Sequence, residues 1–230
     1  MASSIADKGH HGTMPAYWAV IGDIVRSRAL KDRAAWQRRL EDVLAEADRR
    51  FAAGLAAGWT LTLGDEFQAL YRAPQAIPHA VEWLQGALQP ARLRFGIGVG
   101  TLATELKPRA VGMDGPVFHA ARMALDHARR RGKSVTAAEP RGIMDRATDI
   151  WDLALKVAAR RTAMQRRVID SYRELRNQYR TATALGRTQG TVSQHLARAL
   201  YFETEAVLAQ VTAMLKAAGE LETAGERGES

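Results

Sequence analysis

The chain has 230 residues, a formal net charge of +8 at pH 7 and no cysteine, which excludes disulfides, thiolate chemistry and cysteine-based zinc sites. Its apolar stretches are short and interrupted, which excludes a membrane span, and its first residues lack the apolar core of a signal peptide. We expect a cytoplasmic protein with no membrane partner, a disordered arm over residues 1–14 and a disordered, Gly-rich tail over residues 217–230.

The positive charge is concentrated toward one end of the chain. Residues 160–198 contain nine arginines and only two carboxylates, Asp170 and Glu174, so this stretch supplies seven of the eight excess charges. A solvated helix face normally mixes the two signs, whereas a basic block at one end indicates a polyanionic partner. We expect that partner to be nucleic acid.

Apolar periodicity divides the chain into two parts. Up to residue 137 the order of predicted elements is β-α-β-β-α-β-α-β, which indicates an α+β fold with a ferredoxin-like, partly antiparallel sheet, whereas every element from Ala147 onward is helical. We therefore predict a first domain over residues 15–146 and a helical domain over residues 147–216. The predicted strands and helices span residues 16–25, 31–53, 59–63, 67–71, 74–88, 93–102, 116–131 and 134–137.

Two of the apolar strands end on carboxylates. Asp23 ends the first strand, and Asp65 with Glu66 follows the strand that ends near Leu63. One interpretation is a turn or cap, since Gly-Asp is a common turn dipeptide. The other is that neighbouring strands bring the carboxylates together into the all-oxygen site that Mg²⁺ prefers, shared with the phosphates of a nucleotide.

Two further motifs accompany these strand ends. Residues 94–100 read Arg-Phe-Gly-Ile-Gly-Val-Gly, and residues 115–122 read Gly-Pro-Val-Phe-His-Ala-Ala-Arg. With Asp23-Ile24 and Gly64-Asp65, they resemble the ordered motifs of class III nucleotidyl cyclase catalytic domains. Residues 63–67 are also similar to the GGDEF motif of diguanylate cyclases.

A closer resemblance is to the SatD family. It is carried by residues 21–28, 64–68 and 112–116. This bacterial group combines a cyclase-like core with a helical C-terminus, so the resemblance implies a palm-type domain followed by a helical one.

The cyclase resemblance implies a site for a nucleotide of unknown base. In such a site Asp23, Asp65 and Glu66 hold Mg²⁺, the backbone after Asp23 lies near phosphates, and Arg122 neutralises charge. Cyclase sites are completed across a dimer, so the resemblance also implies a homodimer. The candidate nucleotide-binding residues are Asp23, Ile24, Val25, Arg26, Ser27, Asp65, Glu66 and Arg122.

Two positions depart from the cyclase pattern. Phe118 stands where cyclases carry an asparagine that stabilises the transferring phosphoryl group, and Leu61 stands where a lysine selects adenine. Loss of a transition-state donor, with the metal ligands kept, predicts binding without fast turnover. We expect a sensor of a nucleotide or cyclic dinucleotide; the alternative is an active Mg²⁺-dependent nucleotidyl cyclase with a helical regulatory domain.

Two Arg-x-x-Asp sequences, Arg146 to Asp149 and Arg167 to Asp170, resemble the product-binding site of diguanylate cyclases. The same pattern is common on helices as an ion pair, and we favour that interpretation.

Residues 178–196 resemble a helix-turn-helix. Ala182 is small where two helices would cross, Gly186 supplies the positive φ of the turn, and Thr188 would cap the second helix. That helix presents polar side chains to base edges, and the preceding arginines face phosphates. The candidate DNA-binding residues are Arg173, Arg176, Arg180, Arg187, Thr188, Gln189, Thr191, Ser193, Gln194 and Arg198.

After this motif, an amphipathic helix continues to about Lys216. The sequence allows it to pack on its own module or to pair with a second chain, and both alternatives stay open. As a whole, the sequence predicts a DNA-binding transcriptional regulator whose cyclase-like domain senses a nucleotide, with double-stranded DNA as its partner.

Overall fold

The computed structural model describes residues 15–27, 32–62, 64–139, 142 and 144–225, so the predicted arm over residues 1–14 lies outside the described part. No helix in that part has the length and apolar composition needed to cross a bilayer. The strands are β1 (Tyr17–Ile24), β2 (Leu55–Leu61), β3 (Glu66–Tyr71), β4 (Leu93–Gly100) and β5 (Val135–Ala138). The helices are α1 (Arg33–Arg50), α2 (Ile77–Ala87), α3 (Pro116–Arg131), α4 (Met144–Ala159), α5 (Ala163–Leu175), α6 (Gln178–Leu185), α7 (Gln189–Arg198) and α8 (Tyr201–Gly225).

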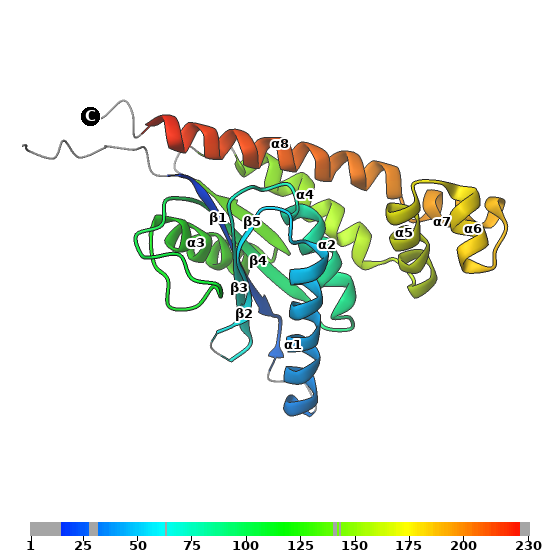
Figure 1. Cartoon of the computed structure of the whole chain (residues 1–230), viewed down its shortest axis with the longest axis horizontal. Coiled ribbons are helices and arrows are strands. Elements are labelled where there is room, and N and C mark those ends of the chain that lie inside the picture. Colours follow the sequence, from blue (N-terminus) through cyan, green and yellow to red (C-terminus); the bar gives the residue numbers. More distant parts are fainter. Residues whose placement is uncertain (1–14, 28–31, 63, 140–141, 143, 226–230) are drawn as a thin grey trace, which may run out of the picture.

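The strands form one sheet in the order β2-β3-β1-β4-β5 (Figure 1). The central strand β1 is antiparallel to both neighbours, and only β4 and β5 run parallel. This order, with helices following β1, β3 and β4, confirms the predicted α+β palm-type fold.

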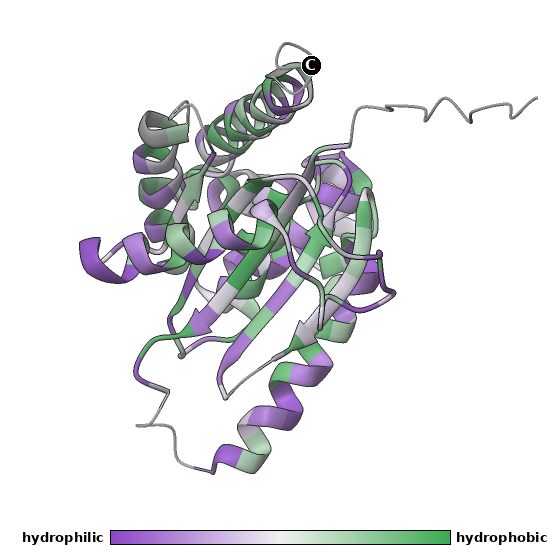
Figure 2. Ribbon diagram, turned by 90° about the vertical axis from the view of Figure 1, so that its left-hand side faces the viewer, coloured by the Kyte–Doolittle hydropathy of each residue, from purple (hydrophilic) through white to green (hydrophobic). Residues whose placement is uncertain are grey.

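Side chains that alternate along the strands create two hydrophobic layers. On β1, Val20 faces the larger core with α1, α2, α4 and α8, whereas Ile21 faces a smaller core beneath α3. Figure 1 shows α3 on one side of the sheet and α1 and α2 on the other. In Figure 2 the hydrophobic colour is concentrated in the sheet, and hydrophilic residues are more frequent on the outer turns of the helices.

Alternate glycines on β4 allow α3 to lie directly on the sheet. A Cβ atom on Gly98 would stand 2.2 Å from the carbonyl oxygen of Val117 and 2.3 Å from the amide nitrogen of Ala121. Gly96 meets Ala121 and Leu125 in the same way. The space that these glycines leave is therefore filled by the backbone of a helix, which fixes the height of α3 above the sheet.

The division of the chain into domains differs from the prediction. Trp151 of α4 and Leu208, Val211 and Leu215 of α8 belong to the larger core beneath the sheet, because both helices turn an apolar face toward it. We call the sheet with α1–α4 and α8 the sheet domain. The predicted boundary at residue 146 thus moves to the end of α4, and a helical unit, α5–α7, is inserted between α4 and α8.

The last helix is longer than predicted, and it packs on the sheet domain. It extends to Gly225, whereas a disordered tail was predicted from residue 217; residues 226–230 lie outside the described part. The indole Nε1 of Trp18 donates to the carbonyl oxygen of Leu215 at 3.0 Å, and the same ring lies against Gly219. Packing on the first strand therefore accounts for the extra helical turns.

The close contact between β4 and α3 predicts a graded response to added methyl groups. We expect Gly98→Ala to lower the free energy of unfolding by about 3 kcal/mol, because the new Cβ overlaps backbone atoms that cannot rotate away. Gly100→Ala on the same strand is the control, since its Cβ would meet its nearest atom at 3.0 Å. Urea unfolding measures both, and equal stability of the two variants would contradict this account of the helix position.

Candidate functional site

Three strands bring the predicted carboxylates together at one end of the sheet. Asp23 on β1 lies directly opposite Glu66 on β3 and opposite Arg94 on β4. Residues opposite one another on antiparallel strands share a face, and here that face is the one covered by α3. Asp23 is 6% exposed, so its charge requires partners.

Helix α3 supplies those partners. Arg129 bridges the two carboxylates, with Nε 2.9 Å from Asp23 Oδ2 and Nη2 2.8 Å from Glu66 Oε1. Arg122 binds the other oxygen of Glu66 at 2.7 Å, and Arg94 lies 3.8 Å from Asp23 Oδ2. We call these five residues the strand-end cluster.

The two carboxylates differ in their proton affinity. Burial raises the pKa of Asp23 above its usual value, and the hydrogen bond and charge of Arg129 offset only part of that effect. Burial also opposes the ionisation of Glu66, but hydrogen bonds from Arg122 and Arg129 outweigh it and hold the pKa of Glu66 below its usual value. The arginines therefore keep Glu66 charged, while Asp23 is the more readily protonated group.

The predicted metal ligands do not share one role. Each oxygen of Glu66 already accepts from a guanidinium group, and the positive charge of those groups opposes a cation there. Asp23 Oδ1, in contrast, is buried and has no hydrogen-bond partner among the described residues. Asp65 is near enough that its charge raises the pKa of Asp23. An oxygen-binding cation thus fits Asp23 and Asp65 better than it fits Glu66, and the described part contains no group of three or more such ligands.

The remaining predicted nucleotide-binding residues line two hollows near the strand ends. Ile24, Ser27 and Asp65 line a small cavity of about 60 Å³ together with Leu61, the position at which cyclases select the base. Val25 and Arg26 line a groove of about 550 Å³. The other charged residues of that groove are Arg92, Arg94 and Lys133, all cationic.

Sequence reasoning missed Arg129, the residue that joins the two carboxylates. It lies seven residues after Arg122, which is two turns later on the same face of α3. The spacing of Arg122 and Arg129 could have indicated that both side chains face the same partners. That inference also requires the knowledge that α3 lies over the strand ends.

The helix-turn-helix has the predicted local geometry. Gly186 ends α6 with φ of +61°, and the Thr188 side chain caps α7 by accepting from the amide of Thr191 at 3.2 Å. Val192 and Leu196 are fully buried against α5 and α6. The unit therefore presents α7 as an outer helix on a small core of its own.

Most of the predicted DNA-binding side chains lie on the surface of this unit. Gln189 and Thr191 are half-buried, because Gln189 bonds Gln178 at 2.6 Å and the Thr191 hydroxyl lies 2.9 Å from that of Thr188. Ser193 is also half-buried. The exposed residues are Arg176, Arg180, Arg187, Thr188, Gln194 and Arg198.

The prediction for Arg173 is wrong. Its guanidinium lies inside the junction between the helical unit and the sheet domain, 2.6 Å from Glu82 of α2 and 2.5 Å from Glu205 of α8. The sequence shows an arginine within a basic block, but its partners stand far away in the chain. Arg173 therefore has a structural role and does not face a phosphate.

Comparison with known proteins gives one family match and several distant structural similarities. Residues 17–138 match the sequence profile of the SatD family, and no curated protein matched the sequence. A bacterial light-regulated adenylyl cyclase is 12% identical, with a TM-score of 0.43 over 55% of this chain and 77% of its own. The active GGEEF domain of a diguanylate cyclase from Vibrio cholerae is 14% identical, with a TM-score of 0.34 over 51% of this chain and 79% of its own.

A further match spans more of the chain. The regulator of polyketide synthase expression from Bifidobacterium adolescentis is 16% identical, with a TM-score of 0.29 over 90% of this chain and 86% of its own.

The bridging role of Arg129 predicts a loss of stability that depends on pH. Arg129→Ala leaves Asp23 and Glu66 without this partner and raises the pKa of both in the folded state only. Above the unfolded-state pKa values of about 4, these two carboxylates then bind more protons in the folded variant than in its unfolded chain, so the variant loses stability relative to the wild type as pH rises through their titration. We expect a loss of about 2 kcal/mol at pH 7, below the range for fully buried pairs because Arg129 is 35% exposed.

Urea unfolding from pH 4 to 8 measures this loss. The matched control is Arg130→Ala, since Arg130 is exposed and has no ion pair among the described residues. A deficit of the same size at every pH would show that Arg129 contributes by packing alone.

Proposed function

The chain belongs to the SatD family over residues 17–138, and we propose that it is a cytoplasmic, homodimeric DNA-binding transcriptional regulator whose sheet domain binds a nucleotide or cyclic dinucleotide as a signal. The helical unit would contact double-stranded DNA, and the strand-end cluster with its two flanking hollows would hold the ligand.

The observation that carries the DNA-binding proposal is the unneutralised charge on the helical unit. Arg176, Arg180, Arg187 and Arg198 are exposed, and none of them pairs with a carboxylate among the described residues. Elsewhere several buried or half-buried arginines pair closely with carboxylates, as Arg122 and Arg161 do. Four free guanidinium groups around a capped outer helix suit a polyanion such as DNA.

The way in which the helical unit is held suggests how a ligand would affect DNA binding. Both neighbours of the unit, α4 and α8, pack into the larger core of the sheet domain. Glu82 of α2 is 7% exposed and bonds both Arg161, at the start of the unit, and Arg173 of α5. A change in the sheet domain would therefore be transmitted through packed helices and buried ion pairs.

The ligand proposal depends on the charges around Asp23. Arg26, Arg92 and Lys133 line the larger groove, and Lys133 has Asp149 as its own partner. We propose that phosphate groups bind in this groove. Mg²⁺, if bound at Asp23 and Asp65, would neutralise further phosphate charge. In this proposal Arg129 orients the carboxylates, and Arg122, which is partly exposed beside Glu66, neutralises phosphate charge.

The alternative, an active nucleotidyl cyclase, would require the strand-end carboxylates to be free for metal ions. Here Arg129 occupies one oxygen of each, and Phe118, 7% exposed, offers no donor at the position of the catalytic asparagine. Incubation with ATP or GTP and Mg²⁺ or Mn²⁺, followed by chromatography, separates the two functions. Abundant cyclic product that Asp23→Ala abolishes would overturn the regulator proposal.

The exposed arginines should contribute to DNA affinity without regard to sequence. Arg180→Ala and Arg187→Ala should each lower the affinity for specific and scrambled duplexes by the same factor. Each should also reduce the slope of log affinity against log salt concentration by about 1, because each phosphate contact releases a counterion. Gln194→Ala should instead reduce the difference in affinity between the specific and the scrambled duplex. The loss of one base contact should weaken binding of the specific duplex by about 1–3 kcal/mol.

Titration of labelled duplexes across a salt series measures both effects, on operator sequences recovered by genome-wide DNA binding. Arg38→Ala, an exposed arginine on α1, is the matched control and should change nothing. If the wild-type protein shows no salt-dependent affinity for any duplex, the arginines serve another partner.

The ligand proposal predicts selective losses of nucleotide affinity. By calorimetry, Arg92→Ala should weaken binding of ATP, GTP or a cyclic dinucleotide about tenfold with or without Mg²⁺, because it removes a phosphate partner. Asp65→Ala should weaken only the part of the affinity that depends on Mg²⁺. Unchanged affinities in both variants, with wild-type binding intact, would show that the strand ends do not hold the ligand.

A further inference from the structure

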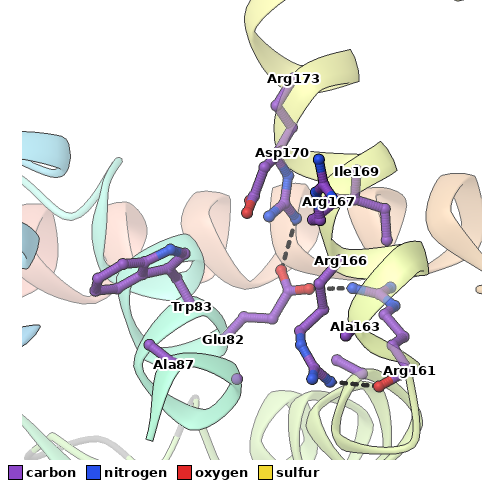
Figure 3. Close-up of a pocket in the computed structure, with 12 residues that line it drawn as sticks. Glu82, Trp83, Ala87, Arg161, Ala163, Arg166, Arg167, Ile169, Asp170 and Arg173 are labelled. Atoms are coloured by element: carbon purple, nitrogen blue, oxygen red, sulfur yellow. Dashed lines mark hydrogen bonds and ion pairs between the residues drawn. The ribbon is translucent and has the colours of Figure 1, made fainter. Parts of the chain in front are cut away.

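A cavity lies where the helical unit meets the sheet domain. Figure 3 shows this cavity, of about 220 Å³, with Trp83 of α2 on one side and Arg166, Arg167 and Asp170 of α5 on the other. A neighbouring cavity of about 360 Å³ shares Trp83, Asp170 and Arg173 with it. These volumes are near the lower end of the range for small-molecule sites, about 300–1,000 Å³.

The two cavities carry an excess of positive charge. Six arginines and four carboxylates line them, which leaves two positive charges when His79 is neutral. The arginines are Arg50, Arg161, Arg166, Arg167, Arg173 and Arg176, and the carboxylates are Glu82, Asp170, Glu174 and Glu205.

Internal ion pairs account for most of these charges but leave donors at the cavity. Glu82 is bound by Arg161 and Arg173, and Glu205 is bound by Arg173. Arg166 donates to the carbonyl oxygen of Arg161 and makes no ion pair in the described part of the chain. Arg167 is exposed and has no carboxylate partner there, so the Arg167-x-x-Asp170 motif does not form the ion pair that we favoured.

Arg173 has an unsatisfied donor at the same junction. Its Nε is buried and has no acceptor among the described residues, although both of its carboxylate partners are bound through Nη2. A buried N–H group without a partner is costly, so the charged groups at this junction are not fully satisfied by one another.

Trp83 gives the cavity a flat apolar surface. The indole is half-buried, and it is held by Phe51, at 5.8 Å between ring centroids, and by the Arg50 guanidinium, 5.4 Å from the ring. A ring fixed in this way offers a stacking surface to a planar ligand without losing side-chain freedom.

We propose that this interdomain cavity binds a small phosphate ester that carries a flat ring, with its phosphate on Arg166 and Arg167 and its ring against Trp83. A phosphate monoester has a charge of about −1.5 to −2 at neutral pH, which matches the excess of positive charge in the cavities. Guanidinium groups bind phosphate oxygens with paired N–H donors, a geometry that suits this ligand. The Asp170 carboxylate opposes an anion there, which limits the affinity and provides a test of where the ligand lies.

The site is separate from the strand-end cluster, and the inference concerns ligand binding alone, so it does not depend on the proposed DNA binding. Calorimetry with the full chain compares AMP, GMP and phenyl phosphate with inorganic phosphate and adenosine. We expect the ring-bearing phosphates to bind at least tenfold more tightly than either of the last two probes.

Variants then locate the site. Arg167→Ala should lower the affinity for phenyl phosphate at least tenfold, and Asp170→Asn should raise it several-fold. Trp83→Leu should reduce the ratio of the affinity for phenyl phosphate to the affinity for inorganic phosphate. Arg167 is exposed, so its replacement leaves the fold intact, which thermal unfolding checks. Arg38→Ala, an exposed arginine on α1 that lines neither cavity, is the control and should not change the affinity.

Two results would overturn the inference. One is the absence of binding by every ring-bearing phosphate up to millimolar concentration. The other is binding that Asp23→Ala abolishes and Arg167→Ala leaves unchanged, which would place the ligand at the strand ends and leave the proposed function of the sheet domain standing.

Discussion

The buried carboxylate of Glu82 determines how the two parts of this protein are joined. It stands on α2, beneath the sheet, and it binds Arg161 at the entrance to the helical unit and Arg173 within α5. A buried charge tolerates few arrangements, since loss of either partner leaves an uncompensated ion in an apolar setting. The orientation of the helical unit on the sheet domain therefore depends on three charged groups that must meet in one place.

Much of the fold could be predicted from local sequence because its signals are local. Gly186, Thr188, Val192 and Leu196 lie within a few residues of one another, and the roles predicted for Gly186 and Thr188 are those that the structure shows. The signals for the strands are local as well, because successive side chains along a strand point to opposite faces of the sheet. The prediction of Asp23 and Glu66 as neighbours needed only the knowledge that their strands pair.

The errors arise where distant segments meet. Arg173 belongs to a basic block by composition, but its partners Glu82 and Glu205 come from α2 and α8. The sequence around Arg173 does not predict these two ion pairs. The tail after residue 217 has the polar, Gly-rich composition of disorder, yet Gly219 is required because only a small residue fits against Trp18. Arg129 was missed because its two partners lie on strands that α3 covers only after folding.

For the proposed binding to DNA, the insertion of the helical unit between α4 and α8 has a consequence. A recognition module on a single flexible linker samples many orientations and tolerates variable spacing between its targets. This unit is held at both of its ends, since α4 and α8 are built into the core of the sheet domain. In a dimer, the distance between two such units would be set by the rigid body that carries them. Such a dimer would bind only where its two half-sites face the same side of the double helix. Insertion of a few base pairs between the half-sites would rotate one of them away from the helical unit that contacts it.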